Sequence, residues 1–255
     1  MAGTPVTRFC QVASMSLPDK DANRPLYARV RERLVERIRS GEWKPGQLIA
    51  NEFEIAAEFG VSQGTARKAI SDLASEGLVV RRQGRGTFVV EHTPAHVLFR
   101  FFNLFDVVGA AVIPDSRDSK ASLAFASAEE RKTLCLDRQA KVIRITRTRT
   151  RNGAPLMRET IALPEALFPG LAERHEMPNT LYDLFQKSYG VLVTRTDDRL
   201  SAVAADLDTA AALVVPPGTP LLKIDRIAFG LDDRPLEWRV SLCHLGDAHY
   251  LARTR

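Results

Sequence analysis

The chain has 255 residues, of which 45% are hydrophobic and 26% are charged, a composition typical of a folded globular protein and not of a disordered one. The length allows one large domain or two modest ones, and the formal net charge of +5 permits a polyanionic partner without requiring one. No stretch approaches the roughly 20 apolar residues that a membrane span needs, so no membrane association is expected.

The cysteines indicate a reducing compartment. Cys10, Cys135 and Cys243 are odd in number and lie far apart, with no CxxC spacing. A disulfide framework or a zinc ribbon is therefore not expected. The N-terminal residues also lack the basic start and apolar run of a secretory signal. The sequence predicts a cytoplasmic protein that holds no metal and no cofactor.

Residues 1–23 show no periodicity and are expected to form a flexible arm. From Pro25 onward, apolar residues recur at every fourth position, which is typical of an amphipathic helix. These residues are Leu26, Val30, Leu34 and Ile38. The helix is expected to end at Ser40-Gly41, because glycine tolerates the left-handed conformation that closes a helix.

Two shorter helices and a hairpin follow. The first of these helices is predicted from Glu52 to Phe59, with Gly60 ending it. Ser62 is placed to cap the next one, which runs to about Glu76. Beyond it, the β-rich runs Leu78–Arg81 and Thr87–Val90 flank a basic turn that contains glycine, which predicts a hairpin.

Three short helices followed by a basic hairpin are the organisation of a winged helix-turn-helix. The third helix would enter the major groove of double-stranded DNA, and the hairpin would reach a neighbouring groove and its phosphates. Hydroxyl, amide and cationic side chains at the start of that helix suit phosphates or base edges. The candidate contacts on the helix are Ser62, Gln63, Thr65, Arg67 and Lys68. In the wing, Arg81, Arg82 and Arg85 supply charge, and Gly84 and Gly86 allow close approach of the backbone.

Three segments occur in order: PLYARVRERLVERIRSGEWKPGQ, EFEIAAEFGVSQGTARKAISDLASEGLV and RRQGRGTFV. In order and spacing they closely resemble the DNA-binding domain of the GntR family of bacterial regulators. The resemblance covers residues 24–91 and implies DNA contacts at Thr65, Arg67 and the Gly84–Gly86 wing tip. Asn51 ends a segment that usually reads Leu-Pro-Ser, and Gln63 stands where arginine is common, so contacts at these two positions stay open. The alternative is a winged helix that binds a protein.

Beyond a linker predicted at residues 92–97, residues 98–255 are expected to form an antiparallel-sheet α+β domain. Asn152-Gly153 and Asp232-Asp233 have the character of hairpin turns between neighbouring strands. The predicted strands are Leu98–Phe105, Ala111–Pro114, Lys141–Arg151, Leu156–Leu163, Val191–Ala204, Pro220–Phe229 and Leu236–Leu245. The predicted helices are Ala128–Leu136, with a capping box of Ser127 and Glu130, then Thr180–Tyr189 and Leu207–Val214.

Two arginines alternate on the strand VIRITRTRTR. Because side chains two residues apart share a face, Arg147 and Arg149 would project together and clamp a carboxylate or a phosphate. Glu159 and Glu237 lie on later strands and would add polar contacts to one concavity. The alternative is a solvated face with cross-strand partners, such as Arg149 with Glu159.

The C-terminal part of the chain also has three segments that occur in order: RTRTRNGAPLMRETIALPEALFPGL, NTLYDLFQKSYG and LVVPPGTPLLKIDRIAFGLDDRPLEWRVSLCHLGDAHY. In this order they resemble the effector-binding domain called UTRA, which defines the HutC subfamily of GntR regulators and is similar in fold to chorismate lyase. The resemblance implies that paired strand arginines hold an anionic group and that glutamates hold polar groups of the effector. Carried over by position, the candidates are Arg147, Arg149, Glu159, Thr180, Tyr182 and Glu237, with Phe102 and Asn103 near the first strand.

These interpretations together predict a transcription regulator that is not an enzyme. It would bind a palindromic operator as a homodimer, repress, and leave the DNA when a small anionic metabolite binds the C-terminal domain. Two alternatives stay open: a lyase-like activity in that domain, for which the sequence offers no nucleophile–base pair, and a DNA binder whose C-terminal domain only dimerises.

Overall fold

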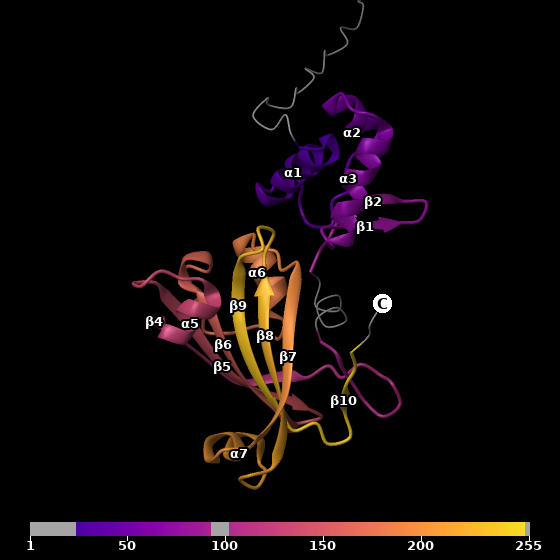
Figure 1. Ribbon diagram of the computed structural model, residues 1–255. Coiled ribbons are helices and arrows are strands. Elements are labelled where there is room, and N and C mark those ends of the chain that lie inside the picture. Colours follow the sequence, from indigo (N-terminus) through magenta and orange to yellow (C-terminus); the bar gives the residue numbers. More distant parts are fainter. Residues whose placement is uncertain (1–23, 93–101, 253–255) are drawn as a thin grey trace, which may run out of the picture. The chain divides into compact units, whose positions relative to one another are not determined.

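A computed structural model describes residues 24–92 and 102–252, so the expected arm, most of the expected linker and residues 98–101 of the first expected strand lie outside the described residues. The chain divides into two compact units, one up to Val90 and one from Glu91 onward (Figure 1). No helix in the described part is both long enough and apolar enough to cross a membrane.

The N-terminal unit contains three helices and one hairpin. The helices are α1 (Leu26–Arg39), α2 (Glu52–Phe59) and α3 (Gln63–Ser75), and the hairpin pairs β1 (Val79–Arg82) with β2 (Gly86–Val89) in antiparallel register. Their apolar faces form one core with fully or almost fully buried side chains, which include Val30, Leu34, Ile55, Phe59, Ala66, Ile70 and Leu73. The predicted helices and hairpin are confirmed to within one or two residues.

The helix ends of this unit follow from local side-chain chemistry. Asn51 accepts hydrogen bonds from the backbone N–H groups of Phe53 and Glu54, and the Glu54 carboxylate accepts one from the Asn51 N–H, which makes a capping box at α2. Gly60 closes α2 in the left-handed region at φ 62°. Ser62 then caps α3 by accepting from the Thr65 N–H at 3.1 Å, as its position predicted.

The C-terminal unit is built on a six-stranded antiparallel sheet in the order β4-β5-β6-β9-β8-β7. Its strands are β4 (Asp115–Phe125), β5 (Lys141–Arg151), β6 (Ala154–Pro164), β7 (Arg195–Ala204), β8 (Pro220–Phe229) and β9 (Pro235–Cys243). A separate pair joins β3 (Leu104–Phe105) to β10 (His249–Tyr250). The helices are α5 (Ala128–Leu134), α6 (Leu181–Tyr189) and α7 (Leu207–Leu213), with short 3₁₀ turns at Glu165–Leu167 and Leu171–Glu173.

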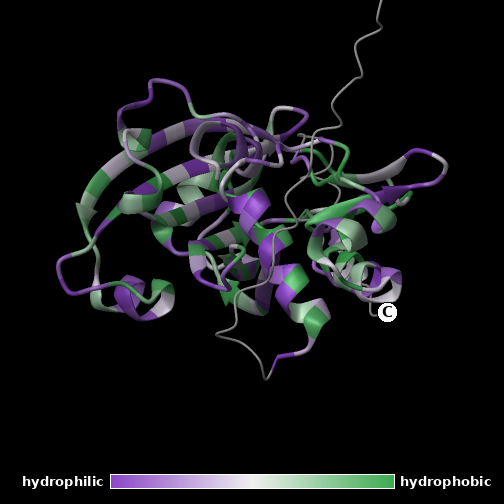
Figure 2. Ribbon diagram, turned by 90° about the horizontal axis from the view of Figure 1, so that it is seen from above, coloured by the Kyte–Doolittle hydropathy of each residue, from purple (hydrophilic) through white to green (hydrophobic). Residues whose placement is uncertain are grey.

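The two faces of this sheet have different coverings, and Figure 2 shows how hydrophilic and hydrophobic residues alternate along its strands. On one face, Ile143, Ile145, Ile161 and Leu163 pack with Leu181, Leu184 and Phe185 of α6. On the other face, Val142, Ala162 and the partly buried Trp238 pack with Leu134 of α5. Farther along the α6 face, Met157, Ile224 and Cys243 pack with Leu104 beside β10. The α6 face therefore carries an apolar cluster at each end.

Four strand predictions were wrong. No strand was expected over β4, which forms an edge of the sheet and is exposed or half-buried along its whole length, so its sequence DSRDSKASLAF shows little of the alternation that marks a half-buried strand. The strand expected from Val191 begins only at Arg195. Of the strand expected at Leu98–Phe105, the described part is extended only at Leu104–Phe105. The strand expected at Ala111–Pro114 does not form, because Ala111 makes only an isolated bridge to Phe105 and the next strand, β4, begins at Asp115. The remaining strands, the three helices and the Ser127–Glu130 capping box are confirmed.

Candidate functional site

The start of α3 presents polar groups at the surface. Ser62, Arg67 and Lys68 are exposed and Gln63 and Thr65 are half-buried. Four of these candidates have contacts in the described structure. The Ser62 hydroxyl lies 2.8 Å from the Thr65 hydroxyl within the helix cap. Lys68 lies 4.4 Å above the Tyr27 ring and 3.6 Å from the Asp72 carboxylate. Arg67 donates from Nε to the Glu52 carboxylate at 3.0 Å, and 61% of its side chain is exposed.

The wing combines charge with two glycines that have positive φ. Arg82 and Arg85 are exposed, and the guanidinium of Arg82 lies 4.7 Å from the centre of the Phe88 ring. Gly84 (φ 67°) and Gly86 (φ 103°) form the turn. Gly86 is required by its backbone even without a ligand, because φ 103° is strained for any residue with a side chain. A Cβ there would also lie 2.6 Å from a methyl carbon of Leu48, whose exposed side chain would have to move.

A charged layer lies on the α6 face of the sheet, between its two apolar clusters. We use this name for four arginines and three carboxylates that project from β5, β6, β7, β8 and β9: Arg147, Arg149, Arg226, Arg239, Glu159, Glu237 and Asp198. All are buried except Asp198, which is half-buried. The interpretation of Arg147 and Arg149 as a solvated face is therefore wrong: only 1% of Arg147 and 2% of Arg149 are exposed.

Glu159 is the centre of this layer. Its carboxylate accepts from Arg147 Nε at 2.5 Å, from an Arg239 NH group at 3.3 Å and from the Ser241 hydroxyl at 3.2 Å. Burial by itself raises the pKa of Glu159, but the surrounding guanidinium groups, Arg147 first, more than offset this and hold the pKa well below its usual range. Glu159 is therefore an anion that neutralises Arg147.

A second carboxylate neutralises Arg239. Glu237 accepts from Arg239 at 3.0 and 2.8 Å, in a bidentate pair, and from the Tyr182 hydroxyl at 3.0 Å. Burial, together with the negative Glu237, raises the pKa of Tyr182 well above its usual value. Tyr182 therefore stays protonated and links α6 to the sheet.

Arg149 differs from the other three arginines, because it pairs with no carboxylate among the described residues. The expected cross-strand pair of Arg149 with Glu159 does not form, since Arg149 lies opposite Met157 in the β5–β6 register. Its guanidinium donates to the carbonyl oxygens of Asn179 and Pro114, both at 2.8 Å, and to the Ser116 hydroxyl at 3.2 Å, while Nε has no partner. Burial and the nearby Arg147 cation lower the pKa of Arg149 to about 9.

The fourth arginine belongs to a group that the sequence did not single out. Arg226 makes a bidentate pair with Asp198, both contacts at 2.7 Å. The Tyr250 hydroxyl donates to the same carboxylate at 2.8 Å and accepts from the Asn103 amide at 3.1 Å. Burial lowers the pKa of Arg226, but the bond and charge of Asp198 more than reverse this and raise it.

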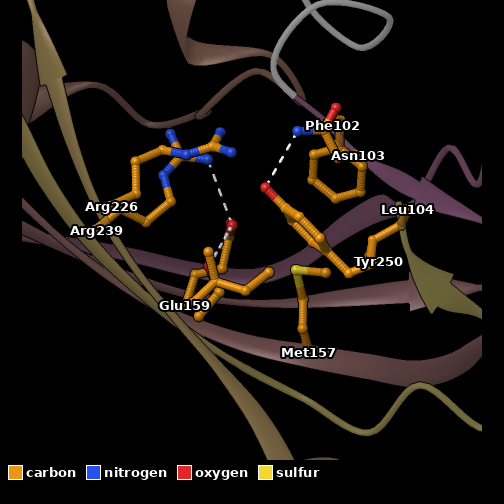
Figure 3. Close-up of a pocket in the computed structure, with 10 residues that line it drawn as sticks. Phe102, Asn103, Leu104, Met157, Glu159, Arg226, Arg239 and Tyr250 are labelled. Atoms are coloured by element: carbon orange, nitrogen blue, oxygen red, sulfur yellow. Dashed lines mark hydrogen bonds and ion pairs between the residues drawn. The ribbon is translucent and has the colours of Figure 1, made fainter. Parts of the chain in front are cut away.

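These side chains border a cavity, shown in Figure 3, in which Arg226, Arg239 and Glu159 on the sheet face Asn103 and Tyr250 on the β3–β10 side. Its lining residues are Phe102, Asn103, Leu104, Met157, Glu159, Ile224, Arg226, Arg239, Ser241 and Tyr250. The free space of about 20 Å³ suffices for a single water molecule. A larger ligand therefore requires side chains to move, and the β3–β10 side is the wall that does not belong to the sheet.

The structure brings most of the predicted effector candidates together. Phe102, Asn103 and Glu159 line the cavity, Arg147 and Glu237 contact its lining residues, and the Arg149 guanidinium lies 5.6 Å from the centre of the Phe102 ring. Thr180 is buried at the start of α6, directly after the Asn179 carbonyl that binds Arg149. It makes no side-chain capping bond there.

Sequence reasoning missed several residues of this site. Arg226 and Ser241 had a signal, because each alternates at period two with other residues of the same face. Asn179, Ser116 and Tyr250 had none, because each comes from a loop, an edge strand or a two-residue strand. No three histidine, cysteine, aspartate or glutamate side chains in residues 24–92 and 102–252 gather as a metal site.

Comparison with known families explains why both units occur in one chain. Residues 113–249 match the UTRA domain, and residues 26–89 match the bacterial regulatory proteins of the gntR family. The chain belongs to the GntR family and carries a UTRA domain. This GntR/UTRA protein is thus a transcriptional regulator, with the fold class that its sequence predicted.

Relatives span almost the whole chain. The HTH-type transcriptional repressor NagR of Bacillus subtilis is 29% identical over 240 residues, which cover 92% of this chain and 98% of NagR. The histidine utilization repressor of Pseudomonas putida is 29% identical over 229 residues, 89% of this chain and 90% of the relative. The crystal structure of PhnF from Mycobacterium smegmatis is similar with a TM-score of 0.52 and 28% identity, covering 89% of this chain and 99% of PhnF. The named activity of both curated relatives is regulation of transcription and not catalysis, so the lyase-like alternative is not supported.

Proposed function

We propose that this GntR/UTRA regulator is a cytoplasmic repressor that binds a palindromic operator in double-stranded DNA as a homodimer. A small anionic metabolite, bound at the charged layer of the UTRA domain, releases it from the DNA. A two-fold symmetric protein matches a two-fold symmetric site, and the spacing of the half-sites then follows from the dimer.

DNA recognition is assigned to α3 and the wing. Gln63 and Arg67 would reach base edges or phosphates at the helix start, with Ser62, Thr65 and Lys68 beside them. Arg82 and Arg85 would contact phosphates next to the glycine turn at Gly84 and Gly86. Asn51 is better explained as the cap of α2, because its side-chain oxygen already accepts two backbone hydrogen bonds.

The uncompensated cation at Arg149 is the observation that carries the effector proposal. The charged layer contains four arginines but only three carboxylates, and three of the arginines have a carboxylate partner. Burying an unpaired charge is unfavourable, and an anion that reaches Arg149 would supply the missing partner. The net excess of one positive charge favours an effector with one negative charge at this point.

Coupling to the DNA-binding unit is assigned to α6. Tyr182 near its start bonds Glu237 in the charged layer, and Gln186 one turn later accepts from the His92 backbone N–H at 2.6 Å. His92 is the second residue after the boundary between the two units. An effector that favours one position of α6 would therefore favour one placement of the linker, and it shifts the equilibrium only by its differential affinity for the two states.

A thermal-shift screen tests the effector site. The wild type, Arg149→Gln and Arg144→Gln would be heated with carboxylates, phosphate esters and amino-acid-derived anions. Arg144 is on the same strand, pairs with Glu130 and points to the opposite face, so it is a matched control. An anion that binds the native state raises its melting temperature. We expect a shift in the wild type and in Arg144→Gln and its loss in Arg149→Gln.

Two other results would contradict this assignment. An equal shift in Arg149→Gln would place the anion elsewhere in the protein. A screen in which no metabolite stabilises the wild type would favour the alternative in which the UTRA domain only dimerises.

A further inference from the structure

Glu52, the first residue of α2, lies beside two arginines from two other elements of the DNA-reading surface. Its carboxylate is 3.0 Å from Arg67 Nε on α3 and 3.4 Å from an NH group of Arg81 on β1. The same NH group of Arg81 donates to the Ser71 hydroxyl of α3 at 3.1 Å. One acidic side chain thus connects the helix that reads DNA with the wing.

The exposure of these side chains shows that the contacts are exchangeable. The side chain of Glu52 is 25% exposed, whereas those of Arg67 and Arg81 are 61% and 49% exposed. Ion pairs between exposed side chains contribute little to stability, so each arginine can exchange Glu52 for an anion that binds it more strongly. A DNA phosphate or a guanine edge is such a partner.

We infer that Glu52 is a positioning residue that sets the sequence discrimination of this regulator. In the free protein it holds Arg67 and Arg81 in place and neutralises part of their charge. A duplex can bind Arg67 and Arg81 only if its contacts with them are stronger than the two ion pairs to Glu52 that are lost. The Glu52 carboxylate also repels the DNA backbone. A matching sequence meets this requirement through base contacts, whereas a random sequence offers only phosphates. The inference rests on the DNA binding proposed above.

Glu54 offers a matched control on the same helix. It is exposed, and its carboxylate accepts from the Asn51 backbone N–H in the capping box, a bond that glutamine retains. Within the described residues, no hydrogen bond or ion pair joins Glu54 to an arginine of α3 or the wing. Glu54→Gln therefore removes the same charge from the same surface without releasing Arg67 or Arg81.

The test compares the full-length wild type, Glu52→Gln, Glu52→Asp and Glu54→Gln. Fluorescence anisotropy would measure binding to a duplex of random sequence and to a duplex that the wild type selects from a random pool, each over a series of salt concentrations. Thermal melting would confirm that all variants are folded.

For Glu52→Gln we expect several-fold tighter binding to the random duplex and a smaller affinity ratio between the selected and random duplexes. Two freed arginines would add up to two phosphate contacts, so the slope of log K against log salt should become steeper by about one to two units. Glu54→Gln should resemble the wild type, and Glu52→Asp should recover much of the ratio.

Two results would overturn the inference. Glu52→Gln could match Glu54→Gln in ratio and slope, which would reduce Glu52 to a general surface charge. Alternatively, Glu52→Gln could weaken binding to both duplexes equally, as expected of a purely structural residue. A wild type that selects no sequence would instead contradict the proposed DNA reading itself, and the salt slopes on the random duplex would still show whether Glu52 restrains the arginines.

Discussion

Arg147 and Arg149 lie two residues apart on one face of β5 but have different partners. Arg147 is paired with the buried Glu159, whereas Arg149 has only carbonyl and hydroxyl acceptors among the described residues. Removing one member of a buried ion pair leaves the other charge poorly compensated, while removing an unpaired buried charge relieves its desolvation. The two arginines should therefore respond to the same substitution in opposite ways.

We predict that Arg147→Met lowers the free energy of unfolding of the ligand-free protein by about 3 kcal/mol, as for other broken buried pairs. Arg149→Met should raise it by about 1 kcal/mol, since the removed charge has no counterion. The Pro114 carbonyl keeps a donor after this change, the Asn179 amide at 3.0 Å. Urea unfolding measures both variants. Equal destabilisation would show that Arg149 stabilises the empty domain and is not kept for a ligand.

The acid stability of the protein should depend on Glu159. Its pKa in the folded state is depressed below the ordinary value of 4.5, so the unfolded chain binds this proton first as the pH falls. The stabilisation from Glu159 is therefore fully present above about pH 4.5 and is lost progressively below it. We predict that Glu159→Gln melts at a lower temperature than the wild type at pH 7 and that the difference narrows between pH 4.5 and pH 3. A difference that is constant over this range would mean that Glu159 does not carry the charge assigned to it.

Helix α6 connects the charged layer to His92, where the expected linker begins. Gln186→Leu removes the buried acceptor that lies 2.6 Å from the His92 backbone N–H. Loss of a buried hydrogen bond of this kind costs about 1–3 kcal/mol, and we expect a decrease of this size in urea unfolding. Ser188→Ala, an exposed change on the same helix, is the control and should have little effect. Similar stability of the two variants would exclude the Gln186–His92 contact as an anchor of the linker.

The sequence predicted well those elements that bury one face, because burial of one face requires apolar residues at regular spacing. Val30 and Leu34 are four residues apart, about one turn of α1, and this spacing places both on the fully buried face of the helix. The edge strand β4 has no such constraint, since most of its side chains are exposed, and its bulge between Arg117 and Lys120 interrupts the pairing register. Local pattern therefore predicted the other strands of the sheet and missed the β4 edge.

The candidate site was predictable to the extent that strand alternation determines it. Period two placed Arg147 and Arg149 on one face, and the structure buries both. Their different partners depend on strand register, which aligns Arg147 and not Arg149 with Glu159. The acceptors of Arg149 come from Asn179 and Pro114, about 30 residues away on each side, and no local pattern relates such positions.

The whole molecule joins a helix-turn-helix unit and a UTRA domain in one chain. If the protein is a homodimer, analytical ultracentrifugation of the free protein should give twice the mass of one protomer. A homodimer also predicts two protomers on each operator duplex. A single protomer on a tightly bound duplex would contradict the symmetric arrangement.

DNA reading by α3 and the wing is best tested by the sequence profile that the full-length protein enriches from a pool of random duplexes. We predict two inverted copies of a short half-site, with centres separated by about 10 base pairs or a multiple of that spacing, because each α3 would enter one major groove. Binding to the enriched duplex should fall steeply with salt. A pool that shows no enrichment for any sequence would contradict the assignment of α3 and the wing to DNA reading.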